Sequence, residues 1–72
     1  MEKTIDSLRI AKNIKGVRLA NHMTQEDMAS LLGYSERQIR RLETEGTYNL
    51  CVINLIALTF DINAQDILFG VS

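Results

Sequence analysis

Three arginines and a glutamate in the middle of the chain have the spacing of one exposed helix face. In a helix of about 3.6 residues per turn, burial of Ile39 and Leu42 leaves these charged side chains pointing outward over two turns. Arginine is the side chain best suited to bidentate contact with guanine O6 and N7 and with phosphate, and a helix fits the major groove of DNA, which is about 12 Å wide. We therefore expect a base-reading face made of Glu36, Arg37, Arg40 and Arg41.

The sequence leaves two features of this face open. Glu36 could accept a hydrogen bond from a cytosine amino group, or it could hold Arg37 or Arg40 in place. The three arginines could also be an ordinary solvated helix face, as exposed arginines usually are. A capped preceding helix, a glycine turn and the absence of basic residues from residues 42–72 favour the binding interpretation.

Charge is distributed unevenly along the chain. The formal net charge is −1, from eight Lys and Arg against nine Asp and Glu. All eight basic residues lie in residues 1–41, which carry a net charge of +3, whereas residues 42–72 contain four acids and no base, a net charge of −4. We expect the basic half to face a polyanion and the acidic half to lie away from it.

The elements that must position the arginine face are two short helices joined by a tight turn. Thr24 is placed to cap a helix over residues 25–32, because its hydroxyl can accept from the backbone amide three residues on. Gly33 then supplies the positive φ that favours a helix C-terminus. This pattern predicts a helix-turn-helix.

The second helix of this motif carries the charged face. Ser35, followed three residues later by Gln38, makes a capping box for a helix over about residues 36–44. The apolar residues expected to anchor the two helices are Met28, Leu31, Leu32, Ile39 and Leu42.

A preceding helix is predicted over residues 7–20, capped by Thr4 or Asp6. Its apolar residues recur at helical spacing, and they are Leu8, Ile10, Ala11, Ile14 and Val17. Gly16 lowers the stability of such a helix by roughly 1 kcal/mol relative to Ala, which hints that another element approaches closely there.

Two more helices are predicted after a loop that contains Gly46. Residues 50–60 are almost entirely apolar, and their length favours a helix over a strand. A last short helix over residues 64–69 would be capped by Asn63 and ended by Gly70.

The apolar helix over residues 50–60 has two candidate stripes. The first can close the core through Leu50, Ile53, Ala57 and Phe60. The second consists of Cys51, Leu55, Leu58 and Ile62. A small domain rarely buries both, so either the core is shifted or the second stripe is a partner surface, most simply that of a two-fold homodimer.

Length and composition limit the classes of protein. A chain of 72 residues fits one domain, 1–72, with flexible residues 1–6, and leaves little room for a catalytic cavity. The single Cys51 and single His22 lack the partners that a disulfide, a metal site or a catalytic base needs, so we expect no cofactor, no metal and no enzyme activity. Cys51 is expected in packing or an interface. The first residues lack the basic segment and apolar run of a signal peptide, no apolar stretch is long enough to span a membrane, and no small-molecule site is evident, so we expect a cytoplasmic location.

The sequence resembles the phage-repressor-like family of helix-turn-helix proteins, also called Xre-type or lambda-repressor-like. The likeness extends from about Ile10 to Leu68 and rests on residues 24–29 (Thr-Gln-Glu-Asp-Met-Ala), 32–35 (Leu-Gly-Tyr-Ser) and 39–43 (Ile-Arg-Arg-Leu-Glu). It implies a compact, all-α domain of five helices, in which the second and third helices form the helix-turn-helix.

The resemblance also implies roles for individual residues. Arg18 of the first helix is expected to pair with Glu43 at the end of the third, as a structural tie. The family contacts DNA at the positions of Ser35, Glu36, Arg37 and Arg41. We expect phosphate contacts, or support for the reading side chains, from Gln25, Ser35, Tyr34 and Lys15.

The sequence departs from the family pattern at three positions. The family usually has Gly two residues after the glutamate, whereas Gly46 lies three after Glu43. His22 and Asp61 stand where the family favours Gly.

These observations predict sequence-specific binding of double-stranded DNA. The third helix would enter the major groove, and two copies of the domain would read a palindromic operator as a homodimer. The expected output is transcription regulation, most simply repression. The alternative is a protein-interaction module of the antitoxin or anti-repressor type, which would use the apolar helix over residues 50–60.

Overall fold

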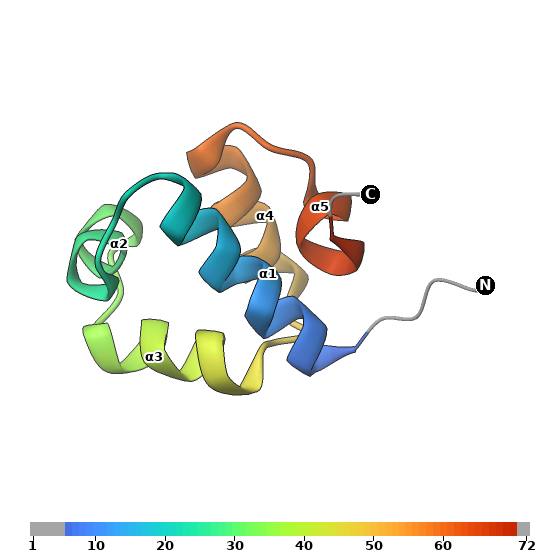
Figure 1. The fold of residues 1–72 in the computed structure, drawn as a ribbon, viewed down its shortest axis with the longest axis horizontal. Coiled ribbons are helices and arrows are strands. Elements are labelled where there is room, and N and C mark those ends of the chain that lie inside the picture. Colours follow the sequence, from blue (N-terminus) through green and yellow to red (C-terminus); the bar gives the residue numbers. More distant parts are fainter. Residues whose placement is uncertain (1–5, 71–72) are drawn as a thin grey trace.

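A computed structural model describes residues 6–70, which form five α-helices and no strand. The all-α prediction is confirmed, and the only helix bound that differs is the end of the third helix, which lies at Glu45 instead of about Thr44. The cap by Thr4 and the flexibility of residues 1–5 lie outside the described residues. The helices are α1 (Ser7–Ala20), α2 (Gln25–Leu32), α3 (Glu36–Glu45), α4 (Leu50–Phe60) and α5 (Ala64–Phe69) (Figure 1).

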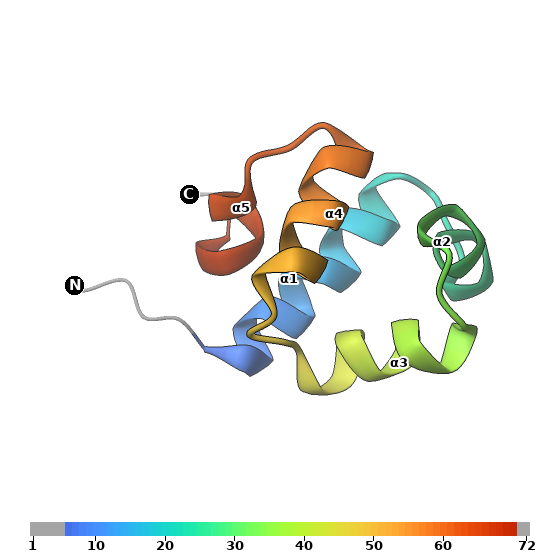
Figure 2. The ribbon, with the colours of Figure 1, turned by 180° about the vertical axis from the view of Figure 1, so that it is seen from behind.

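Helix α1 is the central element of the arrangement. It packs against α3 and α5, while α2 packs against α3 and α4 packs against α5. Figure 1 shows α3 along one side of the molecule with α2 at one end of it, and Figure 2 shows α4 in front of α1 in the view from behind. One face of α3 is therefore left open to solvent.

One hydrophobic core joins all five helices. It includes the fully buried side chains Ile10, Ile14, Met28, Ile39, Ile53, Ile56 and Ile67. Burying a side chain of this size contributes about 1.5–3 kcal/mol relative to leaving it exposed. Because α3 contributes only Ile39 to the fully buried set, its position depends on other contacts as well.

Three expected anchors do not lie in the core. Leu8, Leu31 and Leu50 are all more than half exposed, Leu50 at 62%. On α4 the core is formed by Ile53, Ala57 and Ile56, the last of which belonged to neither predicted stripe. The core side of α4 is thus rotated from the predicted one. A helix that is apolar all round gives no periodic signal to fix its rotation.

Local capping chemistry sets most of the helix bounds. Thr24 and Ser35 each accept from the backbone amide three residues on, at 3.0 and 3.1 Å, and each capping box is closed by the side chain of Asp27 or Gln38. The Asp27 carboxylate accepts from the Thr24 backbone amide at 3.0 Å, and its hydrogen bonds with the backbone and side chain of Thr24 lower its pKa below the ordinary value. The expected cap at Asn63 is wrong in its chemistry, because Asn63 has the N-cap position but makes no side-chain capping bond.

Positive φ angles occur where the turns require them. Gly33 ends α2 at φ 77°, as predicted. His22 and Asp61, which replace glycines of the family pattern, have φ angles of 57° and 55°. Each keeps the left-handed turn that glycine would supply at lower cost.

Gly46 is the residue on which the α3–α4 connection depends. It has φ 74° and ψ −165°, a region that is essentially restricted to glycine. A Cβ atom at this position would overlap the carbonyl oxygen of Ser7. The neighbouring Tyr48 hydroxyl accepts from the Ser7 amide at 3.2 Å. The loop after α3 therefore packs against the start of α1, and this close approach requires glycine at position 46.

Gly16 has no such constraint. A Cβ atom there would meet no atom within 4 Å, so the close approach expected from the sequence is wrong.

We expect Gly46→Ala to destabilise the domain by about 3 kcal/mol or more, because strained φ/ψ and a backbone overlap act together. The matched control is Gly16→Ala, which should stabilise α1 by roughly 0.5–1 kcal/mol. Urea unfolding followed by circular dichroism measures both. Equal midpoints for Gly46→Ala and the wild type would contradict the described loop.

Candidate nucleic-acid interface

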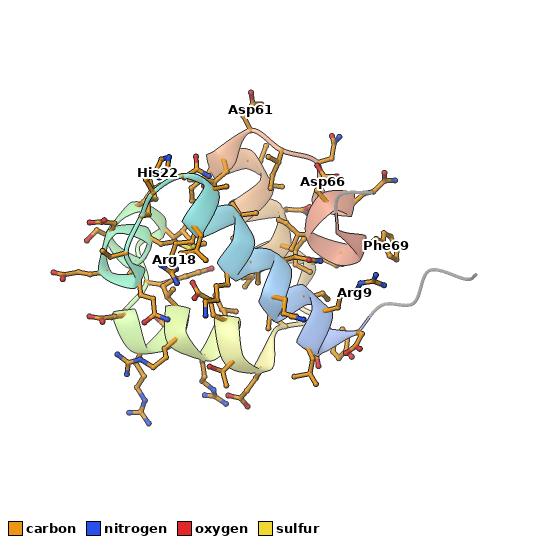
Figure 3. All side chains as sticks on the ribbon, viewed as in Figure 1. Arg9, Arg18, His22, Asp61, Asp66 and Phe69 are labelled. Carbon is orange, nitrogen blue, oxygen red and sulfur yellow. The ribbon has the colours of Figure 1, made fainter. Side chains whose placement is uncertain are left out.

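The open face of α3 presents three arginines. Ile39 is fully buried and Leu42 packs against the core, so Arg37, Arg40 and Arg41 lie on the exposed side of the helix. Together with Thr44 and Glu45 these arginines line a shallow hollow on the surface. Several side chains of α3 project away from α1, as Figure 3 shows. The expected clustering of the arginines on one face is thus present.

Two carboxylates accompany these arginines. Arg40 Nη2 lies 3.4 Å from Glu36 Oε1, and Arg41 Nε donates to Glu45 Oε2 at 3.0 Å. Of the two roles considered for Glu36, this pairing matches the one that holds Arg40 in place. Within residues 6–70, Arg37 forms no ion pair. With Glu45 included, the arginine face therefore carries a net charge of +1 rather than the +2 of the four predicted residues.

Glu45 is a residue that sequence reasoning missed. Its spacing of four from Arg41 was the signal that could have found it.

A buried ion pair holds α3 against the rest of the motif. Arg18 Nε and Nη2 donate to the two oxygens of Glu43 at 2.6 and 2.9 Å, and the Glu43 side chain is only 3% exposed. Arg18 Nη1 also donates to the carbonyl of Met23 at 2.8 Å. The hydrogen bonds to Glu43 and its charge raise the pKa of Arg18, against the opposing effect of burial.

The network extends to the start of α2. The Gln25 amide donates to Glu43 Oε1 at 3.3 Å. In this structure Gln25 thus supports the ion pair, and its contact with DNA stays a prediction. Arg18, Gln25 and Glu43 together connect α1, α2 and α3, and no buried side-chain nitrogen or oxygen within residues 6–70 is left without a partner.

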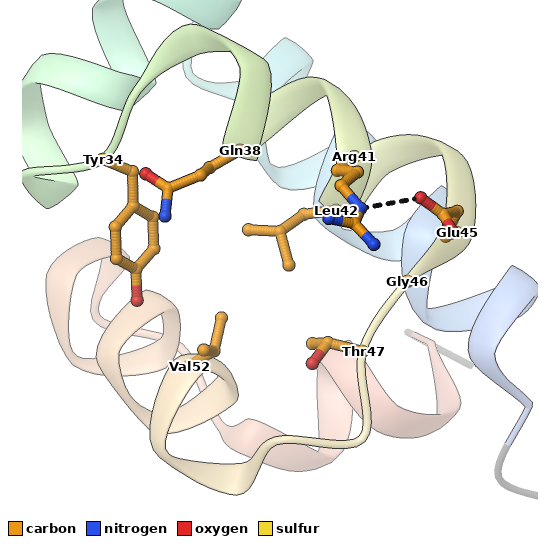
Figure 4. A pocket seen from close by; sticks show the side chains of 8 residues that line it. All are labelled: Tyr34, Gln38, Arg41, Leu42, Glu45, Gly46, Thr47 and Val52. Atoms are coloured by element: carbon orange, nitrogen blue, oxygen red, sulfur yellow. Dashed lines mark hydrogen bonds and ion pairs between the residues drawn. The ribbon is translucent and has the colours of Figure 1, made fainter.

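The other expected phosphate contacts lie in different places. Ser35 is the exposed cap of α3, next to the reading face. Tyr34 is half-buried and lines a groove of about 330 Å³ between α3 and the start of α4, together with Gln38, Arg41, Leu42 and Val52 (Figure 4). Lys15 is exposed on α1. Ser35 and Tyr34 are therefore the expected contacts that adjoin the arginines.

The second stripe of α4 does not form one exposed face. Leu55 and Ile62 are partly buried and pack against the core, whereas Cys51 and Leu58 are exposed, Leu58 at 82%. A shifted core thus accounts for Leu55 and Ile62, and the partner surface stays a prediction for the other two residues. The unpartnered part is Leu58 with Cys51.

The acidic residues divide by position rather than by half of the chain. Asp61 and Asp66 lie on the side of the molecule opposite α3 (Figure 3). Glu43, however, is buried beneath α3 and Glu45 lies on its exposed face. The expectation that the whole acidic half faces away from the arginines is therefore wrong for these two glutamates.

Other kinds of site receive no support from the described residues. Within residues 6–70 no group of three or more His, Cys, Asp or Glu side chains could hold a metal ion. No helix in that range is long and apolar enough to cross a membrane. The exposed His22 is part of a turn.

The comparison with protein families gives one match. A family model for the Cro/C1-type helix-turn-helix DNA-binding domain matches residues 13–69. The matched stretch begins within α1 and contains α2, α3, α4 and α5, so it includes the arginine face and both partners of the buried ion pair. No curated protein matches the chain.

We expect Glu43→Ala to destabilise the domain by about 3–5 kcal/mol, because it leaves the Arg18 charge buried and unpaired. Glu45→Ala makes the same substitution two residues away at an exposed pair, and it should change the free energy of unfolding by less than about 1 kcal/mol. Urea unfolding of the two variants measures the difference. Equal unfolding midpoints would contradict the structural role of the buried pair.

Proposed function

The chain belongs to the Cro/C1-type helix-turn-helix DNA-binding domains, and we propose that it is a sequence-specific transcriptional regulator that inserts α3 into the major groove. The observation that carries this proposal is the exposed arginine face on a capped helix that a buried ion pair holds in place. Domains of this family are typically not enzymes. Repression, by occupying an operator, is the simplest output.

The arrangement of donors suits base reading. Arg37 lies in the first turn of α3 and has its whole guanidinium group available for bidentate contact with guanine. Ser35 at the N-terminus of α3 and Tyr34 beside the groove are in position for contacts to phosphate. The N-terminus of α3 adds the positive end of the helix dipole, which favours phosphate.

The proposed assembly is a homodimer on a palindromic operator. Two domains related by a two-fold axis would read half-sites one helical turn apart and gain affinity and specificity together. The exposed Leu58 and Cys51 on α4 are the proposed centre of the contact between copies.

The same exposed part of α4 supports a second candidate function. A protein-interaction module of the antitoxin or anti-repressor type would bind a different protein through Leu58. DNA binding that depends on the arginines of α3 separates the two functions.

We expect Arg37→Ala and Arg41→Ala each to weaken binding to a duplex selected from a random pool by about 1–3 kcal/mol. Arg9→Ala is the matched control, because it removes the same charge from an exposed site on α1. Titration of selected and random duplexes at two salt concentrations measures the effect. Wild-type binding without a salt dependence, or unchanged affinity in both α3 variants, would remove the DNA-reading function.

We expect Leu58→Glu to convert a dimer into a monomer, because it places a charge at the proposed contact. The control is Leu19→Glu, because Leu19 is also an exposed leucine but lies on α1. It should leave the dimer intact. Sedimentation with and without an operator duplex measures the mass. A wild-type mass that stays monomeric at all concentrations, on and off DNA, would rule out the homodimer.

A further inference from the structure

The ion pair between Arg41 and Glu45 lies on the rim of the exposed face of α3. Arg41 Nε donates to Glu45 Oε2 at 3.0 Å, and the two side chains are 74% and 61% exposed. Figure 4 shows the pair above the groove that Tyr34 and Val52 line. Both side chains are therefore accessible to a duplex that α3 enters.

The stability of α3 does not explain why a glutamate stands at position 45. It lies in the last turn of α3, where the helix dipole disfavours a carboxylate. Its pairing also has the less favourable order, with the cation on the N-terminal side of the acid. Glu36 differs in both respects, because it lies in the first turn and precedes Arg40. Glu36 thus has a local structural explanation and Glu45 does not.

The atoms of the pair leave the base-reading edge of Arg41 free. Glu45 engages Nε, on the side of the guanidinium group. Bidentate contact with guanine O6 and N7 can use the two terminal Nη groups. Arg40 differs, because its contact with Glu36 uses Nη2 itself, at a longer 3.4 Å. Of the two paired arginines of α3, only Arg41 is held through Nε and keeps both terminal Nη groups free for a base.

Glu45 also affects whether Arg41 can bind a phosphate of the DNA backbone instead of a base. A carboxylate next to the guanidinium group repels phosphate oxygens, so it opposes contact between Arg41 and the DNA backbone. A repulsive element of this kind raises specificity by weakening the competing mode of binding. A guanine edge carries two acceptors but no net charge, so the same repulsion hardly affects it.

We propose that Glu45 is a specificity-determining positioning residue, which holds Arg41 by Nε so that its terminal Nη groups read one guanine and which keeps Arg41 off the phosphate backbone. This inference rests on the proposed entry of α3 into the major groove. It assigns guanine selection at one operator position to the pair rather than to Arg41 alone.

The test is selection of bound duplexes from a random pool by wild type, Arg41→Ala, Glu45→Ala and the control Glu36→Ala. Arg41→Ala identifies the operator position that Arg41 reads, as the position where guanine preference is lost. At that position Glu45→Ala should reduce the preference for guanine by about tenfold, within the range of one bidentate contact. Glu36→Ala should leave this position unchanged.

A second measurement uses random duplex. Glu45→Ala should raise the affinity for random DNA at least about threefold at low salt and steepen the salt dependence by up to about one phosphate contact. In the Arg41→Ala background, Glu45→Ala should no longer alter the base preference at the assigned position. Circular dichroism confirms that each variant keeps its helical content.

The outcomes separate the two proposals. If the wild type selects no sequence, the proposed function fails. If the wild type selects a site and Arg41→Ala loses one guanine, but Glu45→Ala keeps that preference in full, only the role of Glu45 is overturned. An equal loss of preference in Glu36→Ala and Glu45→Ala would also overturn it, because the effect would then be one of charge alone.

Discussion

The buried ion pair between Arg18 and Glu43 is the interaction on which the geometry of the helix-turn-helix depends. Helix α3 contributes a single fully buried side chain, Ile39, and an apolar contact of that size has no directional preference. The planar guanidinium group of Arg18, by contrast, meets both oxygens of Glu43 in one orientation. The pair therefore fixes the rotation of α3 about its axis, and with it the set of side chains that faces outward.

A second constraint acts at the end of α3. The loop at Gly46 approaches Ser7 so closely that only glycine fits, and the Tyr48 hydroxyl accepts from the Ser7 amide. Helix α3 is thus tied to α1 at two points, one through Arg18 near the end of α1 and one through Ser7 at its start. Two attachments along a rigid helix restrict tilt as well as rotation. The proposed base-reading role of α3 requires both restrictions, because contacts to base edges are short and directional.

The sequence predicted those features that arise from neighbouring residues. The capping boxes at Thr24 and Ser35 and the positive φ of Gly33 act within a few residues, so the helix bounds followed from local pattern. The rotation of α4 did not, because a helix that is apolar all round offers no polar side to orient it, and Ile56 was buried in place of Leu50. The Arg18–Glu43 pair spans 25 positions and came only from the family resemblance. The close approach of Gly46 to Ser7 is a tertiary contact, and no sequence pattern indicated it.

The charges of the domain make the exact placement of α3 more important than electrostatic attraction to DNA. The chain has a net charge of −1, and two of the three arginines on α3 are paired with carboxylates of the same helix. Long-range attraction to DNA, which depends on uncompensated basic charge and falls off within about 8 Å at physiological salt, is therefore weak. In the proposed function, discrimination among sequences then depends on short contacts that a misplaced helix cannot make. The buried, bidentate ion pair beneath the arginine face is consistent with that requirement, because it sets the geometry of α3 without adding charge toward the phosphates.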